Sequence, residues 1–121
     1  MSHYAVWLDS ENARLFNFLN GTVETNHIVR HEPDHHTHNA RDVPKDSEHF
    51  FHQVCEKLTG ASHVLLLGQA LARTHFQSHL TNHHHGELAK KVVGSETTDH
   101  LTDKQLEAFA RNFFKEHNLA V

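Results

Sequence analysis

The sequence predicts an α/β fold in which helices pack on one five-stranded mixed sheet. Three observations lead to this prediction. Residues 1–30 contain three strand-like segments joined by short polar turns. From residue 47 onward, segments with a helical hydrophobic period alternate with short apolar runs. With 121 residues, 37% of them hydrophobic, the chain is long enough for one core but not two, so residues 1–121 are expected to form a single domain.

The first three strand-like segments are expected to form an antiparallel unit. Residues 4–9 are apolar on both faces, which is typical of a strand covered on two sides. Residues 13–19 follow a polar turn and place two phenylalanines on one face. Asn20-Gly21 predicts a tight hairpin, because both turn positions need positive φ. Residues 22–29 are more polar, so this third strand is expected at an edge of the sheet.

The second part of the chain is expected to alternate helices and strands. Ser47 can cap a first helix that stops at Gly60, and a buried strand follows at residues 63–67. A second helix breaks near its end, a short strand follows at residues 92–94, and a capping box that begins at Thr102 opens the last helix. The apolar stripes expected on the three helices are Phe51, Val54, Cys55 and Leu58; Leu71, Ala72, Phe76 and Leu80; and Leu106, Phe109, Ala110, Phe113 and His117.

The order of these segments determines the expected topology. Connections between parallel strands of one sheet cross over in the right-handed sense. The strand after the first helix must therefore lie parallel to the first strand and on its free side, and the last strand must lie beyond it. The result is the strand order 3-2-1-4-5, which is that of a ribonuclease-H-like fold.

A histidine-rich loop, residues 31–46, separates the three strands from the first helix. It is the longest stretch without a hydrophobic period, and loops of that length in compact domains are usually functional or disordered. The chain has 16 histidines and a formal net charge of −4 when they are neutral. Because the histidine pKa is ordinarily near 6.5, the net charge should be about zero at pH 7 and roughly +8 at pH 6. Exposed histidines would therefore bind a polyanion more tightly in mild acid.

Metal binding is one interpretation of these histidines. His35, His36 and His38 could present three imidazoles to zinc, nickel or copper. His75 and His79 are spaced i and i+4 on one helix and could chelate a single ion. No cysteine accompanies them in a zinc-binding pattern. We therefore expect that the protein requires no cofactor, and zinc or nickel binding is the alternative. The other interpretation is that these are solvated polar residues.

Enzymatic activity has less support. Metal-dependent nucleases with this fold need several carboxylates to hold two divalent ions. Asp9 ends the first strand, but the fourth strand ends without an acid, and Glu48 and Glu56 are expected to face solvent. Asp9 is therefore expected to stabilise the first turn. Cys55 lies on the apolar side of a helix, and the chain has neither a nucleophile elbow nor a Gly-rich phosphate loop.

Nucleic-acid binding is the interpretation that uses the most residues. Arg14 lies on a strand, and further basic and histidine residues occupy the loop and the start of the second helix. If these groups converge at one end of the sheet, they form a donor-rich surface for phosphate contacts. Acidic Glu32, Asp34 and Asp42 in the same loop oppose this interpretation. The residues expected to contact RNA are Arg30, His31, His35, His36, His38, Arg41, Arg73, His75 and His79.

Two stretches resemble a known family. Residues 64–76, VLLLGQALARTHF, resemble the strand, Gly-Pro-Gly turn and Lys-x-x-Phe helix of the central domain in archaeal and eukaryotic peptide-chain release factors and Pelota. Residues 92–97 and 99–106 are similar to a bacterial group of small stand-alone versions, labelled translational-machinery proteins, which also carry a His-rich loop. The resemblance covers nearly the whole chain and implies the same fold.

The chain departs from the family pattern at two places. Its turn is Gly68-Gln69-Ala70, and Arg73 stands where Lys is typical. Release factors carry a Gly-Gly-Gln tip in the loop that corresponds here to residues 31–46, and this loop has no such triplet. The resemblance therefore implies binding to RNA or the ribosome, without peptidyl-tRNA hydrolysis.

These inferences predict a non-enzymatic, translation-associated domain that contacts ribosomal or other RNA through residues 31–46 and the helix start near Arg73. A cytoplasmic location is expected, because the sequence shows no membrane span and no secretory signal, and the lone Cys55 cannot form an internal disulfide. Two alternatives stay open. One is a histidine-mediated metal-binding protein, and the other is an assembly module that uses an exposed sheet edge.

Overall fold

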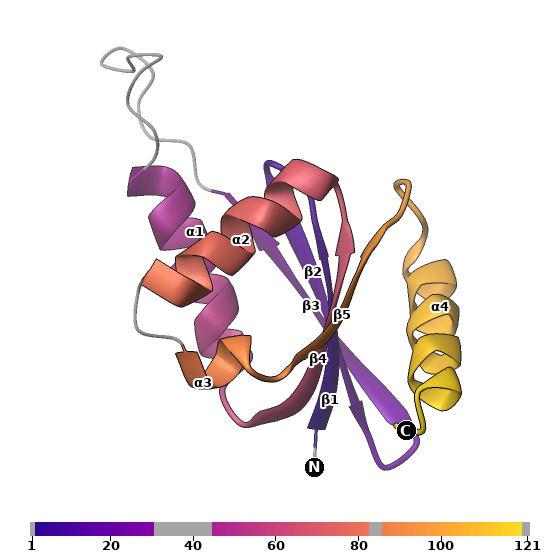
Figure 1. Ribbon diagram of the computed structural model, residues 1–121. Coiled ribbons are helices and arrows are strands. Elements are labelled where there is room, and N and C mark those ends of the chain that lie inside the picture. Colours follow the sequence, from indigo (N-terminus) through magenta and orange to yellow (C-terminus); the bar gives the residue numbers. More distant parts are fainter. Residues whose placement is uncertain (1, 31–44, 83–85, 120–121) are drawn as a thin grey trace.

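The computed structural model describes residues 2–30, 45–82 and 86–119, and its elements follow the predicted order (Figure 1). The three strands come first, and helices and strands alternate after them. The elements are β1 (Ser2–Leu8), β2 (Asn12–Leu19), β3 (Thr22–Val29), α1 (Lys45–Lys57), β4 (Ala61–Gly68), α2 (Ala70–Asn82), α3 (Gly86–Ala89), β5 (Val92–Thr97) and α4 (Asp103–Glu116). In the described part of the chain, no helix is long and apolar enough to cross a membrane.

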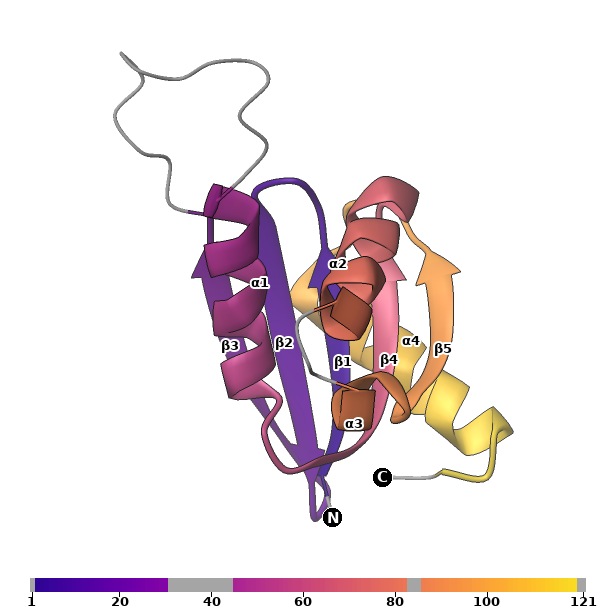
Figure 2. The same cartoon turned by 60° about the vertical axis from the view of Figure 1, so that its left-hand side comes forward.

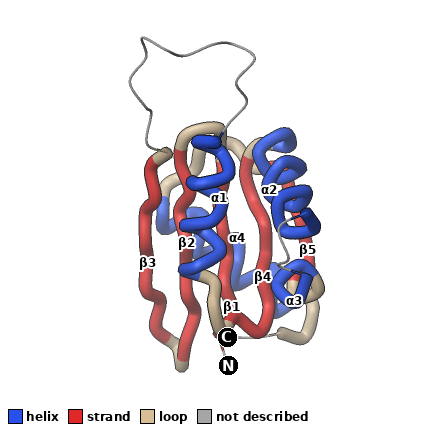
Figure 3. Tube along the Cα trace, turned by 90° about the vertical axis from the view of Figure 1, so that its left-hand side faces the viewer, coloured by secondary structure: helices blue, strands red, loops and turns tan. Residues whose placement is uncertain are grey.

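The sheet has the strand order β3-β2-β1-β4-β5, which confirms the predicted topology (Figure 3). β2 pairs antiparallel with both β1 and β3, whereas β4 pairs parallel with β1 and with β5. Asn20 and Gly21 have φ values of 52° and 82°, so the predicted hairpin joins β2 to β3. The predicted edge position of β3 is also confirmed.

Helices cover both faces of the sheet. α1, α2 and α3 lie on one face and α4 lies on the other (Figure 1). The alternation of side chains along β1 sends Val6 and Leu8 toward the α1–α2 core, and Ala5 and Trp7 toward the α4 core. All four of these residues are buried, which explains why the first strand is apolar on both faces.

The helix boundaries and stripes differ from the predictions in four details. The predicted stripe residue His117 is exposed and forms the C-cap of α4. α1 runs Lys45–Lys57, so Ser47 lies within its first turn and not at the cap. Leu71 is 70% exposed, because the sheet-facing row of α2 is Ala72, Phe76 and Leu80, one helical step away. On α4, the flanking Phe109 is 37% exposed, and the next residue around the buried face, Phe114, is fully buried in its place. The predicted capping box of α4 is confirmed.

Gly68 makes the tight turn from β4 into α2. Its φ is +110°, a conformation that residues with a side chain rarely adopt. A Cβ atom built on Gly68 would lie 2.2 Å from the carbonyl oxygen of Leu8, a backbone atom of the neighbouring strand that cannot rotate away. The close approach of β4 to β1 at this point therefore requires glycine.

Replacing Gly68 with alanine is expected to lower the free energy of unfolding by more than about 3 kcal/mol, because strain and a backbone clash add up. Gly60 is a matched control: its φ is +86°, but a Cβ atom there would meet nothing within 4 Å. Gly60→Ala should cost only the conformational strain, about 1 to 2 kcal/mol. Urea denaturation of both variants tests this, and equal losses would show that the clash with Leu8 is unimportant.

Two histidine rings touch at the opposite end of the sheet. His3 on β1 and His63 on β4 have ring centroids 4.7 Å apart, and the His3 ring packs edge-on against Phe114 of α4 at 5.2 Å. Burial lowers the pKa of His3, and the neighbouring His63 and the amino terminus lower it further. Protonation of His3 is therefore less favourable in the folded protein than in the unfolded chain.

This depressed pKa predicts that stability falls with acidification. The unfolded chain binds the proton near pH 6.5 and the folded protein only at lower pH, so stability is lost as the pH drops below that value. Chemical denaturation at about pH 7.5 and about pH 5.5 should show a smaller loss for His3→Gln than for the wild type. His75→Gln, at an exposed helix position, should keep the wild-type loss. An unchanged loss in His3→Gln would contradict the assignment.

Candidate nucleic-acid interface at the carboxyl end of the sheet

Four of the five strands end on the same side of the molecule. β2 is antiparallel to both of its neighbours and the other pairs are parallel, so β1, β3, β4 and β5 run in one direction. We call the end of the sheet where these strands finish the carboxyl end; α1 and α2 also begin there (Figure 2). It is formed by residues 9–12, Arg30, residues 68–70 and residues 98–102. In open α/β sheets, ligands usually bind outside this end.

Asp9, the carboxylate that a nuclease with this fold would need on its first strand, stabilises the turn between β1 and β2. The Asp9 Oδ1 atom accepts hydrogen bonds from the amides of Glu11 and Asn12 at 2.8 and 2.6 Å, as expected for a turn residue. Glu56 is exposed on α1 and pairs with His52 at 3.1 Å. Burial raises the pKa of the Cys55 thiol to about 12, which removes its nucleophilic character at neutral pH.

Metal binding by the described residues would require a cluster of ligand side chains. In residues 2–30, 45–82 and 86–119, no group of three or more His, Cys, Asp or Glu side chains is placed to hold an ion. The predicted ligands His35, His36 and His38 lie outside the described residues, as do the predicted RNA contacts His31 and Arg41. The predictions for these five residues therefore stay predictions.

Arg73 is buried and ties α2 to the ends of β4 and β5. Only 9% of it is exposed. Its Nε donates to the carbonyl of Gly68 at 3.2 Å, and its two terminal nitrogens donate to the hydroxyls of Ser95 and Thr97. The guanidinium therefore fastens the turn that begins α2 to the last residues of β5.

The other predicted contacts, His75 and His79 on α2 and Arg30 after β3, differ in accessibility. His75 is exposed on α2, whereas His79 is 6% exposed and its ring lies 5.6 Å from that of Phe51. Arg30 is half-buried: its amide donates to the Glu11 carbonyl at 2.7 Å, and its guanidinium reaches the Ser10 carbonyl at 3.4 Å. Of the predicted residues within the described ranges, Arg30 and His75 are the accessible ones.

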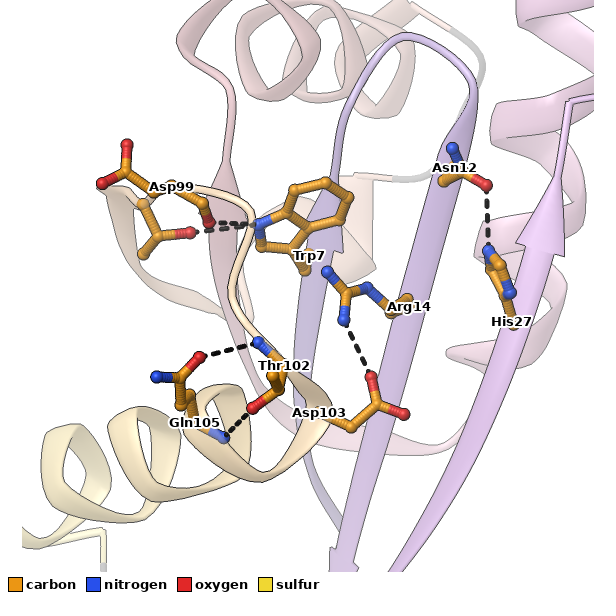
Figure 4. A network of polar contacts seen from close by, with 9 residues as sticks. Trp7, Asn12, Arg14, His27, Asp99, Thr102, Asp103 and Gln105 are labelled. Carbon is orange, nitrogen blue, oxygen red and sulfur yellow. Dashed lines mark hydrogen bonds and ion pairs between the residues drawn. The ribbon is translucent and has the colours of Figure 1, made fainter.

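A network around Trp7 connects the sheet to the segment before α4 (Figure 4). The Trp7 indole Nε1 donates to the Thr98 hydroxyl at 3.1 Å and lies 3.3 Å from the Asp99 carbonyl oxygen. The His100 ring packs edge-on against the indole at 5.0 Å. Since Trp7 is 2% exposed, these contacts satisfy a buried donor and fix the connection between β5 and α4.

Arg14 extends this network and is unavailable as a free phosphate contact. Its Nη1 pairs with the Asp103 carboxylate at 2.9 Å, and its guanidinium carbon lies 4.5 Å from the centroid of the Trp7 ring system (Figure 4). Its other terminal nitrogen is buried with no hydrogen-bond partner among the described residues. The positive charge of the Arg14 guanidinium is therefore stabilised by the face of the Trp7 ring.

Sequence reasoning missed the structural use of Arg14 and Arg73. Both arginines bond to residues far along the chain: Arg14 to Asp103, and Arg73 to Ser95 and Thr97. The one available signal was the pair of hydroxyl residues two positions apart at the end of the last strand. Alternation along a strand places such a pair on the same face, where one guanidinium can reach both.

The chain shares its fold with part of several solved proteins. Archaeoglobus fulgidus Pelota is 14% identical, with a TM-score of 0.62 over 92% of this chain, and Thermoplasma acidophilum Pelota is 15% identical, with a TM-score of 0.63 over 99%. An archaeal translation termination factor is 14% identical, with a TM-score of 0.58 over 98%. No protein-family model and no curated protein sequence matches.

These structures confirm the predicted resemblance at the level of the fold. The chain spans 31%, 35% and 40% of the three proteins, which are therefore much longer. The bacterial assignment and the specific function stay predictions.

The placement of Arg73 predicts a stability role. Arg73→Gln is expected to lower the free energy of unfolding by about 2 to 3 kcal/mol, because Gly68, Ser95 and Thr97 lose their donor together. His75→Gln, two residues further along at an exposed position, should change it by less than about 0.5 kcal/mol. Urea denaturation of the two variants provides the comparison, and an unchanged midpoint for Arg73→Gln would contradict the structural role.

Proposed function

We propose that the chain is a non-enzymatic, translation-associated domain that binds ribosomal or other RNA at the carboxyl end of its sheet. The observation that carries this proposal is the fold shared with an archaeal translation termination factor over 98% of the chain. The histidine-rich loop predicted over residues 31–46 follows β3 and overlaps the first two residues of α1, and both of these elements meet the carboxyl end. Because this segment lacks a Gly-Gly-Gln triplet, the proposal is one of binding without hydrolysis.

The accessible residues narrow the proposed contact surface. Arg30 at the carboxyl end and His75 in the second turn of α2 have side chains at least partly open to solvent, and His100 is exposed beside Trp7. Arg73 and His79 are occupied inside the fold, so their contribution is to position α2. We infer that phosphate contacts come from Arg30, His75 and the loop residues His31, His35, His36, His38 and Arg41.

Histidine as the main cation gives this surface a pH-dependent charge. At a formal charge of −4 with neutral histidines, the protein has no net attraction for a polyanion. Protonation of exposed imidazoles between about pH 7.5 and pH 6 adds positive charge in proportion to their number. Binding should therefore strengthen in mild acid and weaken with salt, because phosphate contacts release counterions.

Ribosome co-sedimentation tests the proposal. The bound fraction should rise between about pH 7.5 and pH 6 and should fall as the salt concentration increases. The simultaneous replacement of His35, His36 and His38 by alanine should remove most of the rise. A control variant that replaces His52 and His117, which are exposed on α1 and at the end of α4, loses imidazoles elsewhere and should keep the rise. Failure of the wild-type protein to bind at either pH would contradict the proposal.

A chelator distinguishes the metal-binding alternative in the same assay. If His35, His36 and His38 act as zinc or nickel ligands, the chelator should abolish binding that depends on them. If they contact phosphate directly, binding should be unaffected by the chelator. We propose the second outcome, in which no metal cofactor is required.

A further inference from the structure

The outer side of β3 presents a row of backbone hydrogen-bonding groups that have no partner strand among the described residues. The Arg30 amide donates to the Glu11 carbonyl of the strand segment before β2. Consecutive residues of an antiparallel strand direct their backbone groups alternately toward and away from the partner strand. The amides and carbonyls of Val23, Thr25, His27 and Val29 therefore point away from β2. In the described part of the chain, no strand lies beyond β3 (Figure 3).

The side chains of β3 do little to protect this edge. Natural edge strands are commonly blocked by proline, lysine or a bulge, or are very short. β3 has eight residues, contains neither proline nor lysine, and pairs with β2 without a register shift. Val29 is 59% exposed at its end. The strand is therefore long and regular enough to accept another strand.

The charged residues near β3 can pair with those of a second copy of the strand that runs in the opposite direction. Glu24 and Arg30 lie on the same face of the sheet, three residues on either side of His27. Neither of them has an ion-pair partner among the described residues. If a two-fold axis passes through His27, Glu24 of each copy lies opposite Arg30 of the other, so the contact contains two ion pairs.

We propose that β3 pairs antiparallel with β3 of a second copy of this chain in this register. Thr25 then lies opposite Val29, and both residues direct their backbone groups toward the new partner. Glu24 and Arg30 form a pair without mutual backbone bonds, which is the type with the more closely spaced side chains. Strand addition to an exposed sheet edge is an established mode of association.

Other registers lack this complementarity. When two copies of β3 pair, each residue must lie opposite one whose side chain is on the same face of the joined sheet. The two-fold axis can therefore pass through one residue or another of β3, but not between two residues. An axis through Asn26 places Glu24 opposite Ile28 and Arg30 opposite Thr22. An axis through Thr25 places Glu24 opposite Asn26. The register centred on His27 is therefore the one among these that pairs the opposite charges.

Analytical ultracentrifugation of the full chain over a range of concentrations, near pH 7.5, tests this inference. The wild type should show a monomer–dimer equilibrium. Glu24→Arg and Arg30→Glu should each weaken the dimer by about tenfold or more, because two attractive pairs become repulsive. The double variant restores opposite charges and should dimerise within a few-fold of the wild type. Thr25→Pro removes an outward amide without removing a β2–β3 bond, and should be monomeric.

Two results would overturn the inference. One is a wild type that stays monomeric up to about 1 mM, a concentration at which even weak association is visible. The other is a double charge-reversal variant that fails to regain the dimer while its thermal unfolding matches that of the wild type. The double variant is compared with the two single charge reversals, so its recovery of the dimer tests the inference even if Thr25→Pro does not fold. Dimerisation can also fail while ribosome binding persists, so the outcome is separate from that of the proposed function.

Discussion

The rest of the structure depends on the complete enclosure of β1. Residues Ala5 to Leu8 are between 0% and 2% exposed, with helices against both faces and strands along both edges. A strand enclosed in this way can carry only apolar side chains, and its backbone bonds are fully used by β2 and β4. The side chains and backbone of β1 are therefore unavailable to an outside partner, and the two proposed contact surfaces lie elsewhere on the sheet. These are the carboxyl end and the free edge of β3.

The carboxyl end is held together by two arginines that link distant segments. Arg73 joins the β4–α2 turn to the end of β5, and Arg14 joins β2 to the first residue of α4 while it packs on Trp7. These contacts fix the positions of the segments at the end of the sheet. Both guanidinium groups are bonded within the fold and are not available to an outside ligand. In the proposed function, an outside ligand contacts Arg30, exposed histidines and the histidine-rich loop. A surface of this kind depends on pH more than one built from lysine and arginine.

Arg30 belongs to both surfaces discussed above. It follows β3 at the carboxyl end, where it precedes the histidine-rich loop, and its amide bonds to Glu11 on the side of β2. A dimer through β3 would bring two histidine-rich loops into one assembly and would use the Arg30 charge in an ion pair. In the two proposals, association of two copies and contact with a polyanion would therefore be linked through one side chain, whose charge can neutralise a carboxylate or a phosphate.

The sequence alone determined the strand order, the hairpin at Asn20-Gly21 and the capping box at Thr102, because these depend on local periodicity, on turn chemistry and on the handedness of crossovers. The tertiary structure alone decided which polar residues are free. Arg73 and His79 are of residue types usually found at the surface, yet they are buried against partners on other elements. Likewise, Leu71 and Phe109 were expected in buried rows but are exposed, and Phe114 is buried instead of Phe109, since the exact angle at which a helix meets the sheet selects its buried row. Local patterns establish the elements, whereas contacts between distant segments establish the surface.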